Sequence, residues 1–124
     1  MKGSYKNSFV LYPTTPEEIC QTAASMPNKE SCGYDVISIE TMKIAIPFIS
    51  APLARVINNS FSQGIVPDST KVAKVLPLFK SGDQTLLSNY RPISLLPSFS
   101  KIFERLVYNR LISYLNKNNI LYDY

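Results

Sequence analysis

The chain has no histidine, and among its 124 residues it has only two cysteines and four glycines. Histidine is the usual base of serine or cysteine nucleophiles and a common transition-metal ligand, so neither kind of site is expected. Cys20 and Cys32 form no Cys-x-x-Cys pair, which indicates reduced, packed thiols. The glycines do not have the spacing of a phosphate-binding loop. We therefore expect the chain alone to catalyse no reaction.

The carboxylates are also too scattered for a metal centre. No two aspartates are adjacent, and each stands beside a residue typical of turns or caps: Asp35, Asp68, Asp83 and Asp123. Glu17 and Glu18 are adjacent, but they fall in the first turn of a predicted helix, where negative charge complements the exposed amides. The chain by itself is not expected to bind a metal ion.

Long apolar runs are absent as well. No stretch of 18 apolar residues is present, so we expect no membrane-spanning segment. The apolar stretch Phe9–Tyr12 is too short for the core of a signal peptide. We expect an intracellular protein, cytoplasmic or nuclear, with one domain that buries about two-thirds of its unfolded surface.

Positive charge is concentrated in the second half of the chain. Residues 1–70 carry five basic and six acidic side chains, whereas residues 71–124 carry eight basic and three acidic ones. Such a distribution is typical of a surface that follows a phosphate backbone, although a mildly basic half-domain can also have no partner.

Capping residues and apolar spacing predict four helices: Pro16–Met26, Ser38–Ala45, Pro47–Gln63 and Ser98–Asn116. Thr15 and Glu18 form a capping box at the first helix. Gly64 should end the third helix, and Pro52 should kink it or shift its start. A single turn is predicted at Asp68 or Ser69, and one short strand near Phe9–Tyr12.

A β-hairpin is predicted between these helices. Two apolar runs, Val72–Phe79 and Tyr90–Leu96, flank a polar stretch rich in turn residues. Ile93, Leu95 and Leu96 are predicted to be core residues. With helices dominant and the hairpin as the main sheet, the fold class is α+β.

Each run carries one cation close to the bend, Lys80 on the first and Arg91 on the second. A lysine and an arginine on adjacent strands near a mobile tip can close over a polyphosphate. The alternative is that both are solvated charges that discourage aggregation at a sheet edge.

Three blocks in the second half of the chain form an ordered set: Pro77–Asp83 (P-x-x-K-x-G-D), Asn89–Leu96 (NYRPISLL), and Lys101–Glu104 (K-x-x-E) with an arginine six residues on. This set resembles the N-terminal fingers segment of reverse transcriptases from non-LTR (LINE, jockey-like) retrotransposons. One departure is Thr70, where the family usually has tryptophan, and the chain contains no tryptophan at all. That loss of an apolar anchor hints at a degenerate copy of the element.

The resemblance implies part of an RNA-directed DNA polymerase. In that family two Mg²⁺ ions are held by aspartates of a later palm segment, which these 124 residues lack. Carried over by position, Lys80 and Arg91 would contact the triphosphate of the incoming deoxynucleotide. Asn89, Tyr90 and Lys74 would contact the template. The implied partners are an RNA template, a DNA primer, a deoxynucleoside triphosphate and the missing palm and thumb.

The resemblance also implies a single partial domain over residues 1–124. Its parts would be an upstream helical region (1–70), the fingers hairpin (71–97) and an amphipathic helix (98–116). Two alternatives remain open at this point. The chain could be a stand-alone RNA- or DNA-binding module, or a non-functional translated remnant with exposed apolar faces.

One cation interrupts the apolar face of the last helix. Arg110 follows Phe103 and Leu106 at helical spacing and precedes Tyr114. A structural role would be snorkelling or an ion pair with an acid from another helix. A functional role would be bracing the base of the fingers or contacting a nucleic-acid phosphate. Lys101 and Arg105, one turn apart on the other side, are predicted to face solvent.

Overall fold

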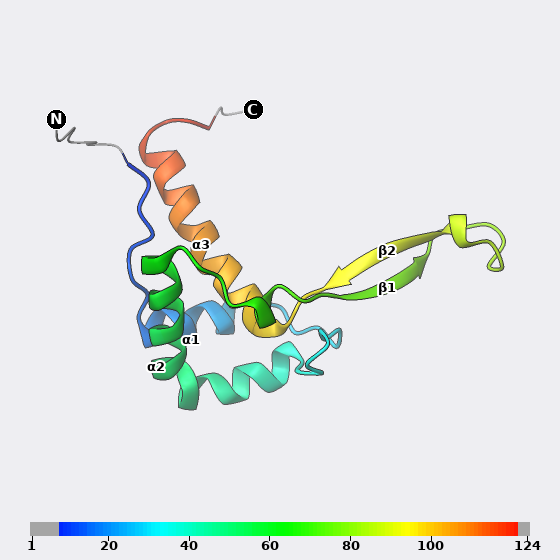
Figure 1. Cartoon of the computed structure of the whole chain (residues 1–124), viewed down its shortest axis with the longest axis horizontal. Coiled ribbons are helices and arrows are strands. Elements are labelled where there is room, and N and C mark those ends of the chain that lie inside the picture. The colour runs from blue at the N-terminus through cyan, green and yellow to red at the C-terminus, as the bar shows by residue number, and fades with distance from the viewer. Residues whose placement is uncertain (1–7, 122–124) are drawn as a thin grey trace.

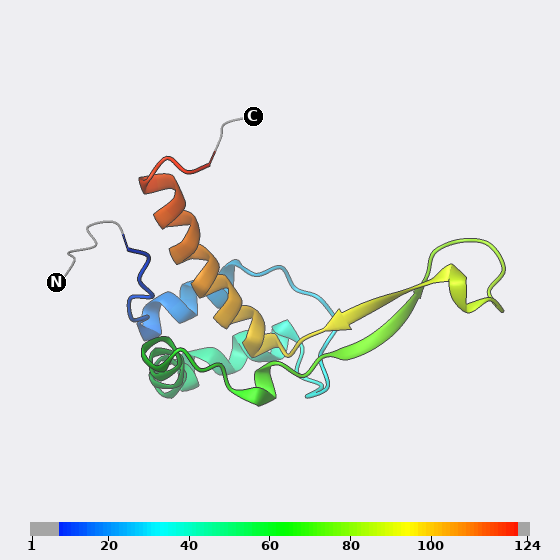
Figure 2. The ribbon, with the colours of Figure 1, turned by 45° about the horizontal axis from the view of Figure 1, so that its top comes forward.

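The structure is a computed structural model that describes residues 8–121. Its helices are α1 (Pro16–Ser25), α2 (Ile39–Gln63) and α3 (Ser98–Lys117), and its strands are β1 (Lys74–Phe79) and β2 (Tyr90–Leu95). Short 3-10 turns lie at Asp68–Thr70 and Leu87–Asn89. Figures 1 and 2 show the helices packed as a body from which the hairpin extends to one side.

The predicted α+β fold class is confirmed. Among the helices of residues 8–121, none combines the length and the hydropathy that a membrane span requires.

Helix α1 begins where its capping residues predict. The Thr15 side chain accepts a hydrogen bond from the Glu18 backbone N–H at 3.2 Å, and Pro16 occupies the first helical position. Ile19 and Ala23 of this helix are buried. The prediction of this helix is confirmed, with an end at Ser25 rather than Met26.

Helix α2 corrects the prediction of two helices over residues 38–63. It runs without a break from the Ser38 cap to Gly64, whose φ of 68° suits a glycine at a helix end. Pro47 and Pro52 lie inside it, and Figure 1 shows a sharp bend in the middle of the helix. A proline lacks the N–H for one helical bond and its ring crowds the preceding turn, so the helix bends there instead of ending.

The core lies entirely in the helical body. Its buried apolar side chains belong to the three helices and to the residue that ends α1: Ile19, Ala23, Met26, Ile39, Met42, Ile46, Ala54, Ile57, Ile102 and Leu106. Both halves of α2 contribute to this cluster. Both sides of the bend are therefore anchored in the same core.

The hairpin contributes no side chain to that core. All six residues of β1 are exposed, and Ile93 of β2 is 38% exposed. Leu95 and Leu96 are only half-buried. The prediction that these three residues are core was therefore wrong for Ile93 and only partly right for the other two, because nothing in the described chain covers either face of the two strands.

The segment before α1 is extended but forms no strand, so the strand expected near Phe9–Tyr12 is absent from the described residues. Side chains hold this segment in place instead. Asn58 of α2 accepts from the Thr14 N–H at 2.7 Å and donates to the Thr14 carbonyl at 2.9 Å.

The base of the hairpin is fastened to the body by hydroxyl groups. Ser98 donates to the Ile37 carbonyl at 2.7 Å, and Ser100 donates to the Thr70 carbonyl at 2.8 Å. A Cβ added to Gly33 would lie 2.7 Å from the backbone nitrogen of Pro97, so only glycine allows the α1–α2 loop to approach so closely. These contacts fix the position from which the hairpin extends.

Candidate nucleic-acid interface

The strand register places Lys80 and Arg91 on the same face of the hairpin. Leu78 pairs with Arg91, and the backbone N–H of Lys80 donates to the Asn89 carbonyl at 2.8 Å. Paired residues of antiparallel strands share a face, and residues two apart along a strand do so as well. The two cations are therefore diagonal neighbours, a relation that corresponds to about 7–8 Å between backbones.

We call this side of the hairpin the cationic face. Its seven positions come from both strands and from the residue just past the end of β1: Lys74, Leu76, Leu78, Lys80, Arg91, Ile93 and Leu95. Lys74 lies at the base, whereas Lys80 and Arg91 lie toward the tip. Apolar side chains separate the two ends, so the face combines positive charge with an exposed apolar surface.

Tyr90 lies on the opposite face. It pairs with Phe79, and the two ring centroids are 5.5 Å apart. Of the residues predicted to contact the template, Lys74 lies on the cationic face, Tyr90 lies on the opposite face, and Asn89 lies in the 3-10 turn at the tip.

The tip is held by its own hydrogen bonds. Asp83 accepts from the backbone N–H and the hydroxyl of Thr85 at 2.8 and 2.7 Å, and these bonds hold the pKa of Asp83 below its ordinary value. Asn89 donates from its side-chain amide to the Asp83 carbonyl at 2.8 Å, and the Tyr90 hydroxyl donates to the Gln84 carbonyl at 2.9 Å. Asn89 and Tyr90 thus shape the loop that separates the two cations.

The charges of Lys80 and Arg91 are not neutralised within residues 8–121. The ion pairs in that range join Lys71 to Asp68 and Arg110 to Glu18. Lys80 and Arg91 are both exposed. An anionic ligand would therefore meet two cations that have no competing carboxylate partner.

Arg110 has a structural environment that accounts for its position on an apolar face. The residue is 1% exposed, and all five guanidinium N–H groups have acceptors. Two of these N–H groups bind the Glu18 carboxylate at 3.0 and 2.9 Å, and the others bind three backbone carbonyls: Tyr12, Pro13 and Leu106. The ion pair with an acid from another helix is confirmed, and no N–H remains for a phosphate.

The same contacts set the ionisation of Glu18. Partial burial raises the pKa of this carboxyl, but hydrogen bonds from Arg110 and Thr14, together with the charge of Arg110, outweigh burial and lower the pKa overall. The guanidinium also lies 4.1 Å from the Tyr12 ring centroid and 5.2 Å from that of Phe61. Arg110 therefore joins α3, α1 and the N-terminal segment.

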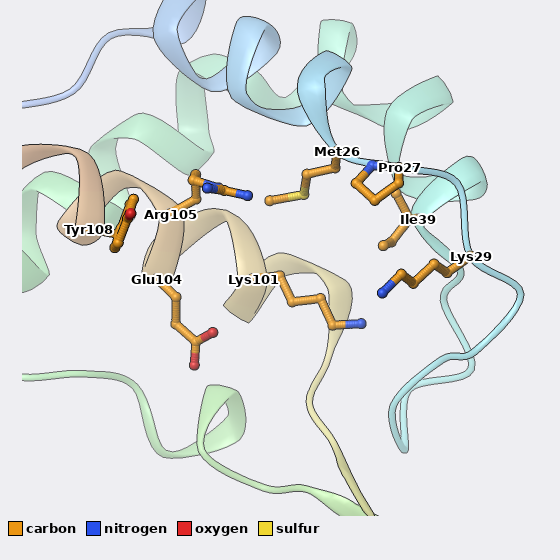
Figure 3. A pocket seen from close by; sticks show the side chains of 8 residues that line it. All are labelled: Met26, Pro27, Lys29, Ile39, Lys101, Glu104, Arg105 and Tyr108. Atoms are coloured by element: carbon orange, nitrogen blue, oxygen red, sulfur yellow. The ribbon is translucent and has the colours of Figure 1, made fainter. Parts of the chain in front are cut away.

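A second group of cations surrounds a cavity of about 430 Å³ between α3 and the loop that follows α1. We call it the basic cavity (Figure 3), and its lining is Met26, Pro27, Lys29, Ile39, Lys101, Glu104, Arg105 and Tyr108. The sequence indicated only that Lys101 and Arg105 lie one turn apart. Lys29 is distant in sequence, so no spacing could have placed it with them.

An apolar hollow of about 710 Å³ lies against another part of α3. Its apolar lining comes from the N-terminal segment, α2, the connections on both sides of the hairpin, and α3: Leu11, Phe61, Val66, Leu96, Phe103, Val107 and Leu111. Its surface is mainly apolar, and its polar lining comes from Ser60, Thr70, Lys71, Ser100, Glu104 and Tyr108.

The carboxylates of residues 8–121 are scattered over the fold. In the described part of the chain, no three His, Cys, Asp or Glu side chains lie close enough to hold a metal ion. Glu18 is bound to Arg110, Asp68 to Lys71, and Asp83 to Thr85. Asp123 lies outside the described residues.

The chain is similar in sequence to RNA-directed DNA polymerases of mobile elements. It is 32% identical over 114 residues to "RNA-directed DNA polymerase from mobile element jockey" of Drosophila melanogaster, and 35% identical over 118 residues to "Probable RNA-directed DNA polymerase from transposon BS" of the same organism. These matches cover 91% and 94% of the chain but only 12% and 13% of the relatives. A third relative, "Transposon TX1 uncharacterized 149 kDa protein" of Xenopus laevis, is 34% identical over 83% of the chain and 8% of its own length.

No protein-family model matches the chain. The pairwise matches nevertheless confirm the resemblance to reverse transcriptases of non-LTR retrotransposons, over about nine-tenths of the chain. They also show that the chain corresponds to a small portion of each relative.

Proposed function

We propose that this chain, a segment of the reverse-transcriptase family of non-LTR retrotransposons, forms the fingers part of an RNA-directed DNA polymerase. The observation that carries the proposal is the shared face of Lys80 and Arg91 near the hairpin tip, where neither has a carboxylate partner. Family membership supplies the chemistry that such a pair of cations would serve.

In this proposal the two cations hold the triphosphate of the incoming deoxynucleotide. Lys80 acts as a compact charge, and Arg91 offers a planar fork that can bind two phosphate oxygens at once. Each charge-assisted hydrogen bond contributes about 1.5–3 kcal/mol when the site closes away from water. Their diagonal relation lets both reach one polyphosphate from the same side.

The template is proposed to lie along the hairpin near Asn89, Tyr90 and Lys74. Lys74 supports this proposal by sharing the cationic face with the proposed nucleotide-binding pair, and Asn89 lies next to that pair in the tip. Tyr90 would act from the other face, or through the tip loop that its hydroxyl holds. Arg110 has a positioning role, because it joins α3 to α1 and to the N-terminal segment.

The remaining parts of the reaction belong to the rest of the polymerase. Mg²⁺ would be held by palm residues outside this segment, and the chain alone is proposed to be inactive. The partners are an RNA template, a DNA primer, a deoxynucleoside triphosphate, and the palm and thumb. Because the template and nucleotides of such a reaction are found inside cells, we propose an intracellular location.

The test replaces Lys80 or Arg91 with alanine in a full-length polymerase that carries this segment. Primer extension is measured against deoxynucleotide concentration, and each change should raise the KM for nucleotide about tenfold or more, as expected for the loss of about 1.5 kcal/mol or more of binding free energy. Lys71→Ala is the matched control, because Lys71 is already paired with Asp68. Unchanged nucleotide dependence in both variants would exclude the triphosphate role.

A second candidate is a stand-alone RNA- or DNA-binding module, favoured by the unpaired cations of the hairpin. It predicts a salt-sensitive affinity of the 124-residue chain for RNA and normal activity of the polymerase variants above.

A further inference from the structure

We propose that the basic cavity binds the phosphate backbone of single-stranded nucleic acid, at a site separate from the hairpin. The inference rests on the proposed function, because it assigns a second contact to the nucleic acid that the polymerase would handle. None of the residues that line the cavity comes from the hairpin, so the two sites can be tested independently.

Three cations reach the cavity from two parts of the fold. Lys101 and Arg105 come from successive turns of α3, and Lys29 comes from the loop after α1. All three line the cavity, and Figure 3 shows the ammonium ends of Lys29 and Lys101 directed toward each other and the guanidinium of Arg105 beside Met26. Three donors around one space match an anion with several oxygen acceptors.

The loop that carries Lys29 is held in position. The Lys43 ammonium of α2 donates to the Met26 carbonyl and to the Asn28 side chain, the latter at 2.8 Å. Arg105 is also oriented, because its guanidinium lies 5.7 Å from the centroid of the Tyr108 ring. The cavity therefore has a defined shape before any ligand binds.

The three cations have no ion-pair partner among residues 8–121. Glu104 lines the cavity, but Figure 3 shows its carboxylate directed away from the three cationic groups. Glu30 and Glu40 lie with Lys29 around a neighbouring hollow rather than in the cavity itself. A surplus of positive charge remains inside the basic cavity.

The other lining residues favour a nucleic-acid strand over a free anion. Pro27 is an exposed apolar group and Tyr108 adds a half-exposed aromatic ring, whereas Met26 and Ile39 of the lining already pack in the core. A free phosphate would use the cations and leave Pro27 and the ring without a partner. A nucleotide chain offers phosphates to the cations and sugars or bases to Pro27 and the ring.

The test is direct binding of the 124-residue chain to a fluorescein-labelled 15-nucleotide oligouridylate RNA, followed by anisotropy between 50 and 300 mM KCl. The variant is Lys101→Gln with Arg105→Gln. At 0.1 M salt each lost phosphate contact should weaken binding about fivefold, and the slope of log K against log salt should fall by about 1.4 for the pair. The variant Lys29→Gln should add a further loss of about fivefold.

The matched control is Arg55→Gln with Lys117→Gln, which removes two cations that line no part of the cavity. It should bind RNA as the unchanged chain does, with the same slope. Circular dichroism should give the same thermal transition for all variants. Equal losses in the control and cavity variants, or no binding by the unchanged chain, would overturn the inference.

Competition with 1 mM inorganic phosphate and with 1 mM dTTP separates the ligand sources. RNA binding by the unchanged chain should persist, because a small anion engages only part of the cavity. The opposite result would be complete displacement of RNA from the unchanged chain by phosphate or dTTP, with no such displacement from the Lys101→Gln, Arg105→Gln variant. That result would identify a pocket for small anions and overturn the inference.

Failure of this inference and failure of the proposed function give different results. Normal RNA binding by the cavity variants, together with a raised nucleotide KM in the Lys80 and Arg91 variants, would exclude only the second site. Weakened RNA binding by the cavity variants, together with an unchanged nucleotide KM in the hairpin variants, would exclude only the triphosphate role.

Discussion

The helical body and the hairpin use their apolar side chains in opposite ways. In the body, Ile102 and Leu106 of α3 are fully buried against α1 and α2. In the hairpin, Leu78 is 54% exposed and Val75 is 59% exposed. The body therefore has a core of its own, whereas the hairpin depends on strand hydrogen bonds and on its attachment at the base.

This difference agrees with the separate roles proposed for the helical body and the hairpin. A closed body can hold the base of the hairpin in place, and an uncovered hairpin can present cations and apolar groups to ligands. An isolated two-stranded hairpin is at best marginally stable in water. Substitutions in the body should therefore change folding, and substitutions on the hairpin should change binding.

The largest expected effect is that of Arg110→Ala. Removing this buried cation leaves three backbone carbonyls and the Glu18 carboxylate without their donor, and such a loss costs about 3–5 kcal/mol of unfolding free energy. Urea denaturation measures the change. The control Arg105→Ala, on the exposed side of the same helix, should change stability by no more than about 0.5 kcal/mol. Similar effects of the two substitutions would contradict the structural role of Arg110.

The next-largest expected effect is the difference in stability loss between a leucine of the body and a leucine of the hairpin. Leu106→Ala should destabilise the chain by about 2–5 kcal/mol, because it opens a cavity in the core. Leu78→Ala should cost no more than about 0.5 kcal/mol, because that side chain is already in water. Thermal unfolding of both variants checks the pair. A large loss from Leu78→Ala would show that the hairpin has a covering that the described residues do not provide.

The smallest effect is a dependence of stability on pH. The pKa of Glu18 is lower in the folded chain than its ordinary value of 4.5, so the unfolded chain binds the proton more readily. This contribution is complete above the ordinary value and is lost as the pH falls through the lowered pKa. Urea midpoints from pH 7 to pH 3 should fall, and less steeply in Glu18→Gln. Some decline should remain in that variant, because the pKa values of Asp68 and Asp83 are lowered as well.

Local signals allowed much of the secondary structure to be predicted. The Thr15 cap, the glycine after α2 and the apolar spacing of α3 act between residues that are close in sequence, and each placed a helix end or a helix correctly. The error at α2 arose because prolines are strong local breakers, whereas burial on both sides of the bend is a tertiary effect. The exposure of Ile93 was also missed, because burial of a strand residue depends on tertiary contacts that the local apolar pattern does not report.

The residues of the candidate sites also fall into two groups, those that the sequence could identify and those that only tertiary packing brings together. Lys80 and Arg91 could be identified from the chain because a hairpin brings together residues that are near in sequence, and the register then decided that they share a face. The basic cavity could not be identified, since Lys29 meets Lys101 and Arg105 only after α1 and α3 pack. An ion pair of Arg110 with an acid from another helix was one of the roles that the sequence left open, and no sequence pattern indicated which acid.

The order of residues alone determined the capped helices, the hairpin, the concentration of positive charge and the family to which the segment is similar, because each depends on neighbouring residues or on motif spacing. Tertiary structure decided which side chains meet across distant parts of the chain. It joined Arg110 to Glu18, continued α2 through two prolines and gathered three cations around one cavity. Those outcomes depend on how the elements pack, and packing is a property of the whole fold.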